Sequence, residues 1–420
     1  MIIHLLRLFL IVLSTHCYSI DHESVSAYTM NSRTGEVLLD QDGDRSLIPA
    51  SCMKLITIGA ALHVLGPDMR FQTHLEYDGT LDEQGVLHGN LYIRGEGDPC
   101  LGSNRIPSSL SWQEQVDVWV MAIVKLGIVR IDGEVIGDAT RWEKQMAVSS
   151  WLWEDLANYY GVGASALSFH ENSYTLFFKP GDQEGDHTTI VRLDPPLTML
   201  TLINEVKTGS KDSGDRANIY GMEYYLVQHM RGTVPLGGEF SIKGAIPDPP
   251  TTCAYFLTQA LENKKIAIGH SSYPQSKERK VIHTTYSPTV KEIVHWTNQK
   301  SINLYAEHLL KKMGEVVHGE GSTAAGIKAV TSFWKAQGID LSGFNMEDGS
   351  GLSRKNFVTA KQLVAILKKM KESSHFVIFF DSLPEIEGRR EKRGTQSKIR
   401  CFAGYHGDTI FATLVNFSSK

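Results

Sequence analysis

The hydrophobic pattern of this chain changes twice along its length, and these changes predict where helices and strands fall. Residues 24–30 and 36–40 flank the turn 31–35, which predicts a β-hairpin. Apolar positions at helical spacing then run from 55 to 66 and predict a mostly buried helix. The Gly66-Pro67 pair is expected to stop that helix, because proline cannot continue it.

The middle of the chain has a mostly β pattern. Short strands punctuated by glycine are predicted from 71 to 140, and one helical segment at 112–127 interrupts them. Residues 165–245 again predict strands, with the charged loop 210–216 between them. A helix at 252–263 is expected to close this middle portion.

The pattern becomes mainly helical near residue 287. The Ser287-Pro288 pair is expected to supply the N-cap and first residue of a helix over 289–297. Thr359 and Gln362 predict a capping box. The other elements expected here are a loop at 298–303, helices at 304–314, 322–336 and 360–371, a turn at 348–351, and final strands at 399–405 and 409–417 joined by residues 406–408.

These patterns together predict a multi-domain α/β (α+β) chain. Both ends combine helices with antiparallel strands, whereas the middle is mostly β. We therefore expect one α/β domain that is split by a large insertion. The length of 420 residues fits two or three domains.

Composition narrows the possible functions. The net charge of −5 gives no basic footprint for nucleic acid, so no nucleic-acid partner is expected. No His-Glu-x-x-His or Cys-x-x-Cys spacing occurs, so no metal and no other cofactor is predicted. The cysteines beyond the N-terminus allow three disulfide pairings and also fit small buried residues; they are Cys52, Cys100, Cys253 and Cys401.

Residues 1–19 predict a secretory signal peptide. Arg7 ends a short charged region, an apolar run follows at 8–13, and Cys17-Tyr18-Ser19 is a small-x-small cleavage site. The alternative, an uncleaved anchor, requires a longer apolar run. Export to the periplasm or cell envelope is therefore expected.

The candidate chemistry begins with Ser51 and Lys54. Two residues three positions apart on a helix lie on one face. A serine hydroxyl needs a base, and a lysine can serve when burial and nearby positive charge lower its pKa. The helix N-terminus also offers the backbone N–H of Ser51 to an oxyanion. The alternative is an N-cap serine followed by an incidental lysine.

Two further groups would complete such a site. Ser301 and Asn303 lie in a loop, where a hydroxyl can relay a proton and an amide can hold a carbonyl, although both residue types also favour loops for local reasons. The other group is a cationic strand edge that binds a carboxylate. The only literal Lys-Thr-Gly, at 207–209, runs directly into a polar loop, so it predicts a strand end. Lys392-Arg393-Gly394-Thr395, just ahead of the strand at 399–405, is a second candidate.

Several stretches, in order, make the chain resemble the class C low-molecular-mass penicillin-binding proteins, the D-alanyl-D-alanine carboxypeptidase/endopeptidase family. They are IPASCMKL (48–55), LGPDMRF (65–71), GNLYIRGEGDP (89–99), LINEVKTG (202–209), SPTVKEIVHWTNQKSINLYAEHLL (287–310), EDGSGLSR (347–354) and DSLPEIEG (381–388). Aligning Ala403-Gly404-Tyr405 with the end of the family's last motif places Lys392, Gly394 and Thr395 on Lys-Thr-Gly-Thr.

The resemblance implies a fold of nested domains. A penicillin-binding domain with an antiparallel sheet and helices, similar to serine β-lactamases, is interrupted by a mostly β insertion of two nested domains. The expected limits are 20–78 and 283–420 for the penicillin-binding domain, 79–163 and 245–282 for the second domain, and 164–244 for the third.

The resemblance also implies acyl transfer on the stem peptides of peptidoglycan, and acylation by β-lactam antibiotics. Ser51 would attack the D-Ala-D-Ala bond with Lys54 as base, and Ser301 would relay a proton. The substrate would be held by Asn303, Lys392, Arg393, Gly394 and Thr395. Carboxypeptidase and endopeptidase activity both stay open.

Two departures from the family pattern keep other readings open. Arg393 stands where the family has threonine, and only residues 385–391 separate Pro384 from Lys392, where the family has a longer segment. A catalytically impaired relative that binds peptidoglycan or scaffolds wall enzymes is therefore the main alternative. A β-lactamase or esterase is less favoured, because β-lactamases lack such an insertion.

Overall fold

The structure is a computed structural model, and it describes residues 23–269, 273–276 and 278–417. The predicted signal peptide, residues 1–19, lies outside the described residues. Within these ranges, no helix combines the length and the apolar character needed to cross a membrane.

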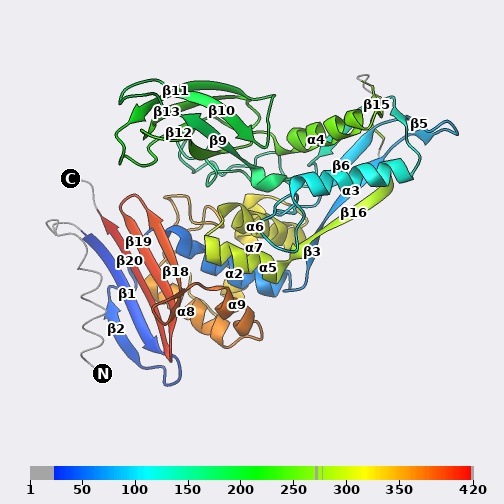
Figure 1. Ribbon diagram of the computed structural model, residues 1–420. Coiled ribbons are helices and arrows are strands. Elements are labelled where there is room, and N and C mark those ends of the chain that lie inside the picture. The colour runs from blue at the N-terminus through cyan, green and yellow to red at the C-terminus, as the bar shows by residue number, and fades with distance from the viewer. Residues whose placement is uncertain (1–22, 270–272, 277, 418–420) are drawn as a thin grey trace.

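The two ends of the chain meet in a six-stranded antiparallel sheet of order β17-β18-β19-β20-β1-β2. β1 pairs with β20 in register from Glu23↔Phe417 to Asn31↔Thr409, so the first and last described strands lie side by side (Figure 1). The strands are β1 (Glu23–Asn31), β2 (Val37–Gln41), β17 (Glu385–Ile386), β18 (Arg389–Gln396), β19 (Ile399–His406) and β20 (Thr409–Phe417).

Helices pack against this sheet and form one large buried cluster with it. α2 is its centre, because every residue from Met53 to Leu62 is buried. The helices are η1 (Ala50–Cys52), α2 (Met53–Val64), α5 (Val290–Lys300), α6 (Asn303–His318), α7 (Thr323–Ala336), α8 (Ala360–Lys371) and α9 (Phe376–Ser382).

The middle of the chain forms a second buried cluster and four smaller sheets. One sheet has the order β16-β3-β6-β8, from β3 (Arg70–Tyr77), β6 (Leu91–Gly95), β8 (Val135–Asp138) and β16 (Lys280–Thr289). Another joins β4 (Thr80–Leu81), β5 (Val86–His88), β7 (Arg130–Ile131) and β15 (Ala267–Ile268), and helices α3 (Trp112–Lys125) and α4 (Pro249–Asn263) accompany them. The third contains β9 (Ser173–Lys179), β10 (Thr189–Asp194) and β14 (Phe240–Ala245), and a short turn η2 (His170–Asn172) precedes β9. The fourth contains β11 (Thr201–Gly209), β12 (Asn218–Tyr220) and β13 (Val227–Pro235).

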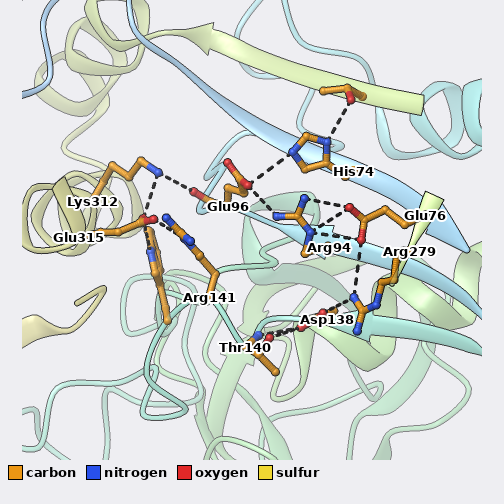
Figure 2. Close-up of polar contacts among 12 residues, drawn as sticks. His74, Glu76, Arg94, Glu96, Asp138, Thr140, Arg141, Arg279, Lys312 and Glu315 are labelled. Carbon is orange, nitrogen blue, oxygen red and sulfur yellow. Dashed lines mark hydrogen bonds and ion pairs between the residues drawn. The ribbon is translucent and has the colours of Figure 1, made fainter. Parts of the chain in front are cut away.

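A network of charged side chains connects α6 to strands β3 and β6 (Figure 2). Arg94 on β6 donates to Glu76 on β3 and to Glu96. Lys312 on α6 donates to Glu315 at 3.0 Å and to the Glu96 carbonyl at 3.5 Å. The network therefore fixes the helix that begins at Asn303 against the four-stranded sheet of β3.

The predicted mixed α/β class is confirmed, with several sheets and helices, and the limits of the nested domains stay a prediction. The predicted start of the helix after residue 287 is wrong. β16 continues through Thr289, which pairs with Arg70, so the N-cap of α5 is Thr289. Glu292 accepts from the Thr289 backbone N–H at 2.8 Å and from its hydroxyl at 2.6 Å. The buried Ser287 hydroxyl instead accepts from Phe71 N at 2.9 Å within the sheet.

Candidate active site

Ser51 and Lys54 meet at the junction of η1 and α2. Ser51 lies in the 3-10 turn rather than in the α-helix, and Lys54 is the second residue of α2. Lys54 Nζ lies 3.2 Å from Ser51 Oγ, 2.6 Å from Asn303 Oδ1 and 2.7 Å from the Ser350 carbonyl oxygen. Three acceptors therefore fix the amine of Lys54 beside a partly exposed serine hydroxyl.

Burial makes Lys54 a possible base at neutral pH. Its side chain is fully buried, and desolvation lowers the pKa of Lys54 to about 7. The positive charge of Lys392 contributes to this lowering, whereas Asp348 and Glu307 oppose it. At neutral pH the amine can therefore be neutral and accept the proton of Ser51.

Ser301 and Asn303 come from the link between two helices. α5 ends at Lys300, Ser301 takes the left-handed conformation with φ 56°, and α6 begins at Asn303. The predicted loop at 298–303 is thus shorter than expected, because residues 298–300 still belong to α5. Asn303 contacts Lys54 through its amide oxygen and donates to the Tyr160 carbonyl at 2.8 Å. The link therefore places Ser301 two residues before Asn303, whose amide oxygen accepts from the Lys54 amine.

The predicted Lys-Arg-Gly-Thr stretch lies on β18, against η1. Lys392 is 3% exposed and donates to the Asn298 carbonyl, in the last turn of α5, at 3.2 Å. Burial lowers the pKa of Lys392 to about 8. The C-terminus of α5 favours the charged form of the Lys392 amine, against the effect of burial. In that form, Lys392 lowers the pKa of Lys54.

Gly394 allows β18 to approach the serine closely. A Cβ atom at this position would lie 2.6 Å from the Pro49 carbonyl and 2.8 Å from Ser51 N. Real Cβ contacts of that length essentially never occur. Only glycine therefore lets the strand pass the backbone N–H of Ser51, and Thr395 follows it along the strand.

Arg393 lies on the other face of β18 from Lys392, and it shares its exposed face with Thr395. Arg393 Nε donates to Glu391 Oε1 at 2.7 Å, and the guanidinium lies 5.6 Å from the ring centroid of Phe402. The short segment 385–391 contains β17, a turn at 387–388 and the start of β18. β17 pairs only with residues 389–390, so within the described chain no strand pairs with the outer edge of β18 beside Lys392–Thr395.

The other candidates lie where a structural role was predicted. The literal Lys-Thr-Gly ends β11, with an exposed Lys207, in the separate sheet β11-β13-β12. Cys52 is buried, and its thiol donates to the Lys392 carbonyl at 3.3 Å. The four cysteines that the structure describes are all buried free thiols, so none of the three possible disulfide pairings is formed.

Sequence analysis missed the role of the turn at 348–351. The turn forms as predicted, but its Ser350 carbonyl is one of the three acceptors for Lys54. Ser350 N and Gly349 N donate to Glu307 at 2.8 and 3.1 Å. The signal available in the sequence was an acidic residue, Glu307, four residues after Asn303 and so one helical turn further along.

The chemistry that this arrangement supports is acyl transfer by a serine nucleophile. The hydroxyl of Ser51 has an amine base within hydrogen-bond distance, and that base is buried where it can lose its proton. A cationic strand with a glycine at the point of closest approach lies next to it.

Comparisons with known proteins agree with this chemistry. The model of the family described as D-Ala-D-Ala carboxypeptidase 3 (S13) matches residues 15–402. The D-alanyl-D-alanine carboxypeptidase of Actinomadura sp. (strain R39) is 27% identical over 425 residues, which cover 92% of this chain and 76% of that protein. The crystal structure of penicillin binding protein 4 from Haemophilus influenzae has a TM-score of 0.80 at 19% identity, over 95% of this chain and 91% of that one. A structure of the same protein in complex with a β-lactam has a TM-score of 0.75 at 18% identity, over 95% and 92% of the two chains.

Proposed function

Because this chain belongs to the D-Ala-D-Ala carboxypeptidase 3 (S13) family, we propose that it is an exported serine DD-peptidase of peptidoglycan with Ser51 as its nucleophile. One observation carries the assignment of the site. The fully buried Lys54 amine lies 3.2 Å from Ser51 Oγ, and its pKa is lowered to about 7. The pattern of residues 1–19 supports export.

In the proposed reaction, Ser51 Oγ attacks the carbonyl carbon between the two terminal D-alanines while Lys54 takes the hydroxyl proton. The backbone N–H groups of Ser51 and Thr395 stabilise the oxyanion. Ser301 relays the proton to the leaving amine, and D-alanine departs. Water then attacks the acyl-enzyme, Lys54 again accepts a proton, and the shortened peptide leaves.

The remaining groups hold the substrate. Asn303 binds the peptide amide, and Thr395 binds the terminal carboxylate on the exposed face of β18. Lys392, buried on the other face, adds its positive charge behind the strand. Arg393 adds charge at the rim of the same edge. A β-lactam enters by the same route and acylates Ser51, because its ring amide takes the place of the D-Ala-D-Ala bond.

The test is to incubate the purified mature protein with a penicillin and measure its intact mass, then map the adduct by peptide mass spectrometry. We expect one penicillin equivalent on the peptide that contains Ser51. Release of D-alanine from a pentapeptide, and of the shortened stem from a cross-linked muropeptide, separates carboxypeptidase from endopeptidase. An adduct without release of either product would favour the impaired relative, and no adduct at saturating penicillin would overturn the proposal.

The Arg393→Thr variant is expected to be acylated at least as fast as the wild type. Threonine is smaller than arginine on the exposed face shared with Thr395, and the buried Glu391 keeps Arg389 as a second partner. The Arg393 side chain is 44% exposed and is already paired with Glu391. Second-order acylation rates measure the effect, with Arg400→Thr as a control that removes the same charge from the neighbouring strand. A large loss confined to Arg393→Thr would show that this arginine is itself the carboxylate anchor.

A further inference from the structure

The backbone of a single residue, Ser350, connects Lys54 to a second buried charge. The Ser350 carbonyl accepts from Lys54 Nζ at 2.7 Å, and Ser350 N donates to Glu307 Oε1 at 2.8 Å. Gly349 N donates to the other oxygen of the same carboxylate at 3.1 Å. Glu307 is 1% exposed, so it lies behind the base with both oxygens held by the turn.

The turn between Lys54 and Glu307 is fixed from several sides. Thr57 on α2 donates to the Gly349 carbonyl at 2.7 Å. Asp348, fully buried, accepts four hydrogen bonds, from Gly351 N, Ser353 N, Asn356 Nδ2 and Trp151 Nε1. These hydrogen bonds hold the turn rigidly, so the position of Glu307 determines the position of the Ser350 carbonyl beside Lys54.

α6 therefore acts on Lys54 at two points. Asn303, its first residue, contacts the amine directly at 2.6 Å. Glu307 is one turn further along the same face and acts through Ser350. The charged network in Figure 2 holds the far end of this helix through Glu315, which accepts from Lys312 and from Trp142 Nε1.

The electrostatic surroundings of Lys54 come from four elements. Lys392 on β18 disfavours its charged form, whereas Asp348 in the turn, Glu307 on α6 and Cys52 on η1 favour it. Burial and, to a smaller extent, the charge of Asp348 raise the pKa of Glu307 to about 7, against the hydrogen bonds from Ser350 and Gly349. Lys54 and Glu307 thus gain and lose their protons in the same pH range, within reach of each other's charge.

We propose that Glu307 is a positioning residue for the reaction: acting through the Ser350 peptide, it holds the Lys54 amine on Ser51 and sets the pH at which that amine becomes neutral. The proposal rests on the proposed function, since it needs Lys54 to be the base. Its consequence is a pH profile that depends on a residue in contact with neither substrate nor nucleophile.

The direction of the pH effect follows from the charges. The ionised Glu307 carboxylate favours the charged form of Lys54, so removing it makes the amine neutral at lower pH. Acylation needs the neutral amine and therefore falls on the acid side of the profile. In Glu307→Gln this acid limb moves to lower pH, by roughly one pH unit for a nearby charge. The plateau rate also falls, by roughly tenfold, because glutamine replaces one carboxylate oxygen with an NH2 group. That donor faces one of the two turn N–H groups, so the base is held less firmly.

The wild type carries a readout of its own. As the pH falls, Glu307 becomes protonated and ceases to favour charged Lys54. The acylation rate therefore falls over a wider pH range than the titration of a single proton would produce. Its slope is then shallower than that of a single titration, with two apparent pKa values. A limb of one-proton slope in the wild type, and an unchanged limb in a folded Glu307→Gln, would each overturn the proposal.

The experiment measures the second-order rate of penicillin acylation from pH 5 to 9 for the wild type, Glu307→Gln, Glu307→Asp and Glu315→Gln. Glu307→Asp keeps the charge, so its limb stays with the wild type even where its plateau falls. Glu315→Gln removes the same charge from α6 eight residues further on, roughly 12 Å along the helix, and its limb should not move. If the Glu315→Gln limb moves as far as that of Glu307→Gln, the effect is not specific to the Ser350 link and the proposal fails.

The two proposals fail in different ways. A wild type that forms no adduct at any pH overturns both the proposed function and the role of Glu307. A wild type that is acylated normally, with a limb that Glu307→Gln leaves unmoved, overturns the role of Glu307 alone.

Discussion

The Ser51→Ala variant will form no covalent adduct with penicillin, whereas Cys52→Ala will form one. Ser51 is partly exposed and lies 3.2 Å from the Lys54 amine. Cys52 is fully buried and hydrogen-bonded to the Lys392 carbonyl, so its thiol faces the interior. Adjacent residues therefore give a matched pair: one substitution removes the nucleophile, and the other removes only a packing contact.

Intact-mass measurement after incubation with penicillin decides the outcome, and thermal unfolding confirms that both variants are folded. We expect Cys52→Ala to be acylated within about tenfold of the wild-type rate, since it loses one weak hydrogen bond beside β18. An adduct on Ser51→Ala, mapped to a peptide without residue 51, would show that another residue is the nucleophile.

The Lys54→Met variant will be acylated about 10²- to 10⁴-fold more slowly than the wild type, the usual contribution of a general base. Methionine keeps the length of the side chain in a fully buried site but cannot take the proton from Ser51 Oγ. It also leaves Asn303 Oδ1 and the Ser350 carbonyl without their donor, so some loss of thermal stability is expected.

The Lys54→Arg variant tests whether the site needs a base at this position or only a positive charge. Arginine keeps a positive charge but does not lose its proton in proteins, so Lys54→Arg should be as slow as Lys54→Met if Lys54 is the base. Single-turnover acylation rates give the comparison. A fast Lys54→Arg variant would mean that the site needs only positive charge at this position.

The elements that were predicted well are those specified by residues close in sequence. The hairpin of β1 and β2 follows from the turn at 31–35, and the N-terminus of α8 from the capping box of Thr359 and Gln362. Ser51 and Lys54 belong to this class too, because one turn of chain brings them together.

The wrong predictions arise where a distant segment decides. Ser287-Pro288 has the local features of a helix start, but pairing with β3 keeps the chain extended through Thr289. α9, Phe376–Ser382, is a seven-residue helix with no clear pattern of its own, and it packs against α5. The role of Glu307 was missed because its partners are backbone N–H groups some forty residues away, which no side-chain motif reports.

The stretch Lys392–Thr395 shows how far a sequence motif can stand in for knowledge of contacts between distant segments. Its place on a strand beside the serine followed from its resemblance to a known order of motifs. The close contact of Gly394 with Ser51 N, and the exposure of Arg393 on the face of Thr395, depend on the register between β18 and β19. These features became visible only in the folded chain.

The pairing of β1 with β20 also determines when the protein can become active. Nine residue pairs join the two ends, so almost the entire chain forms the loop between neighbouring strands. Closing such a loop costs entropy, and contacts so distant in sequence form late in folding. As the chain leaves the ribosome, sheets such as that of β9, β10 and β14 can assemble while β1 still lacks its neighbour. The serine on η1 meets β18 only after the long segment between them has been synthesised, so a nascent chain that still lacks β18 has an incomplete site.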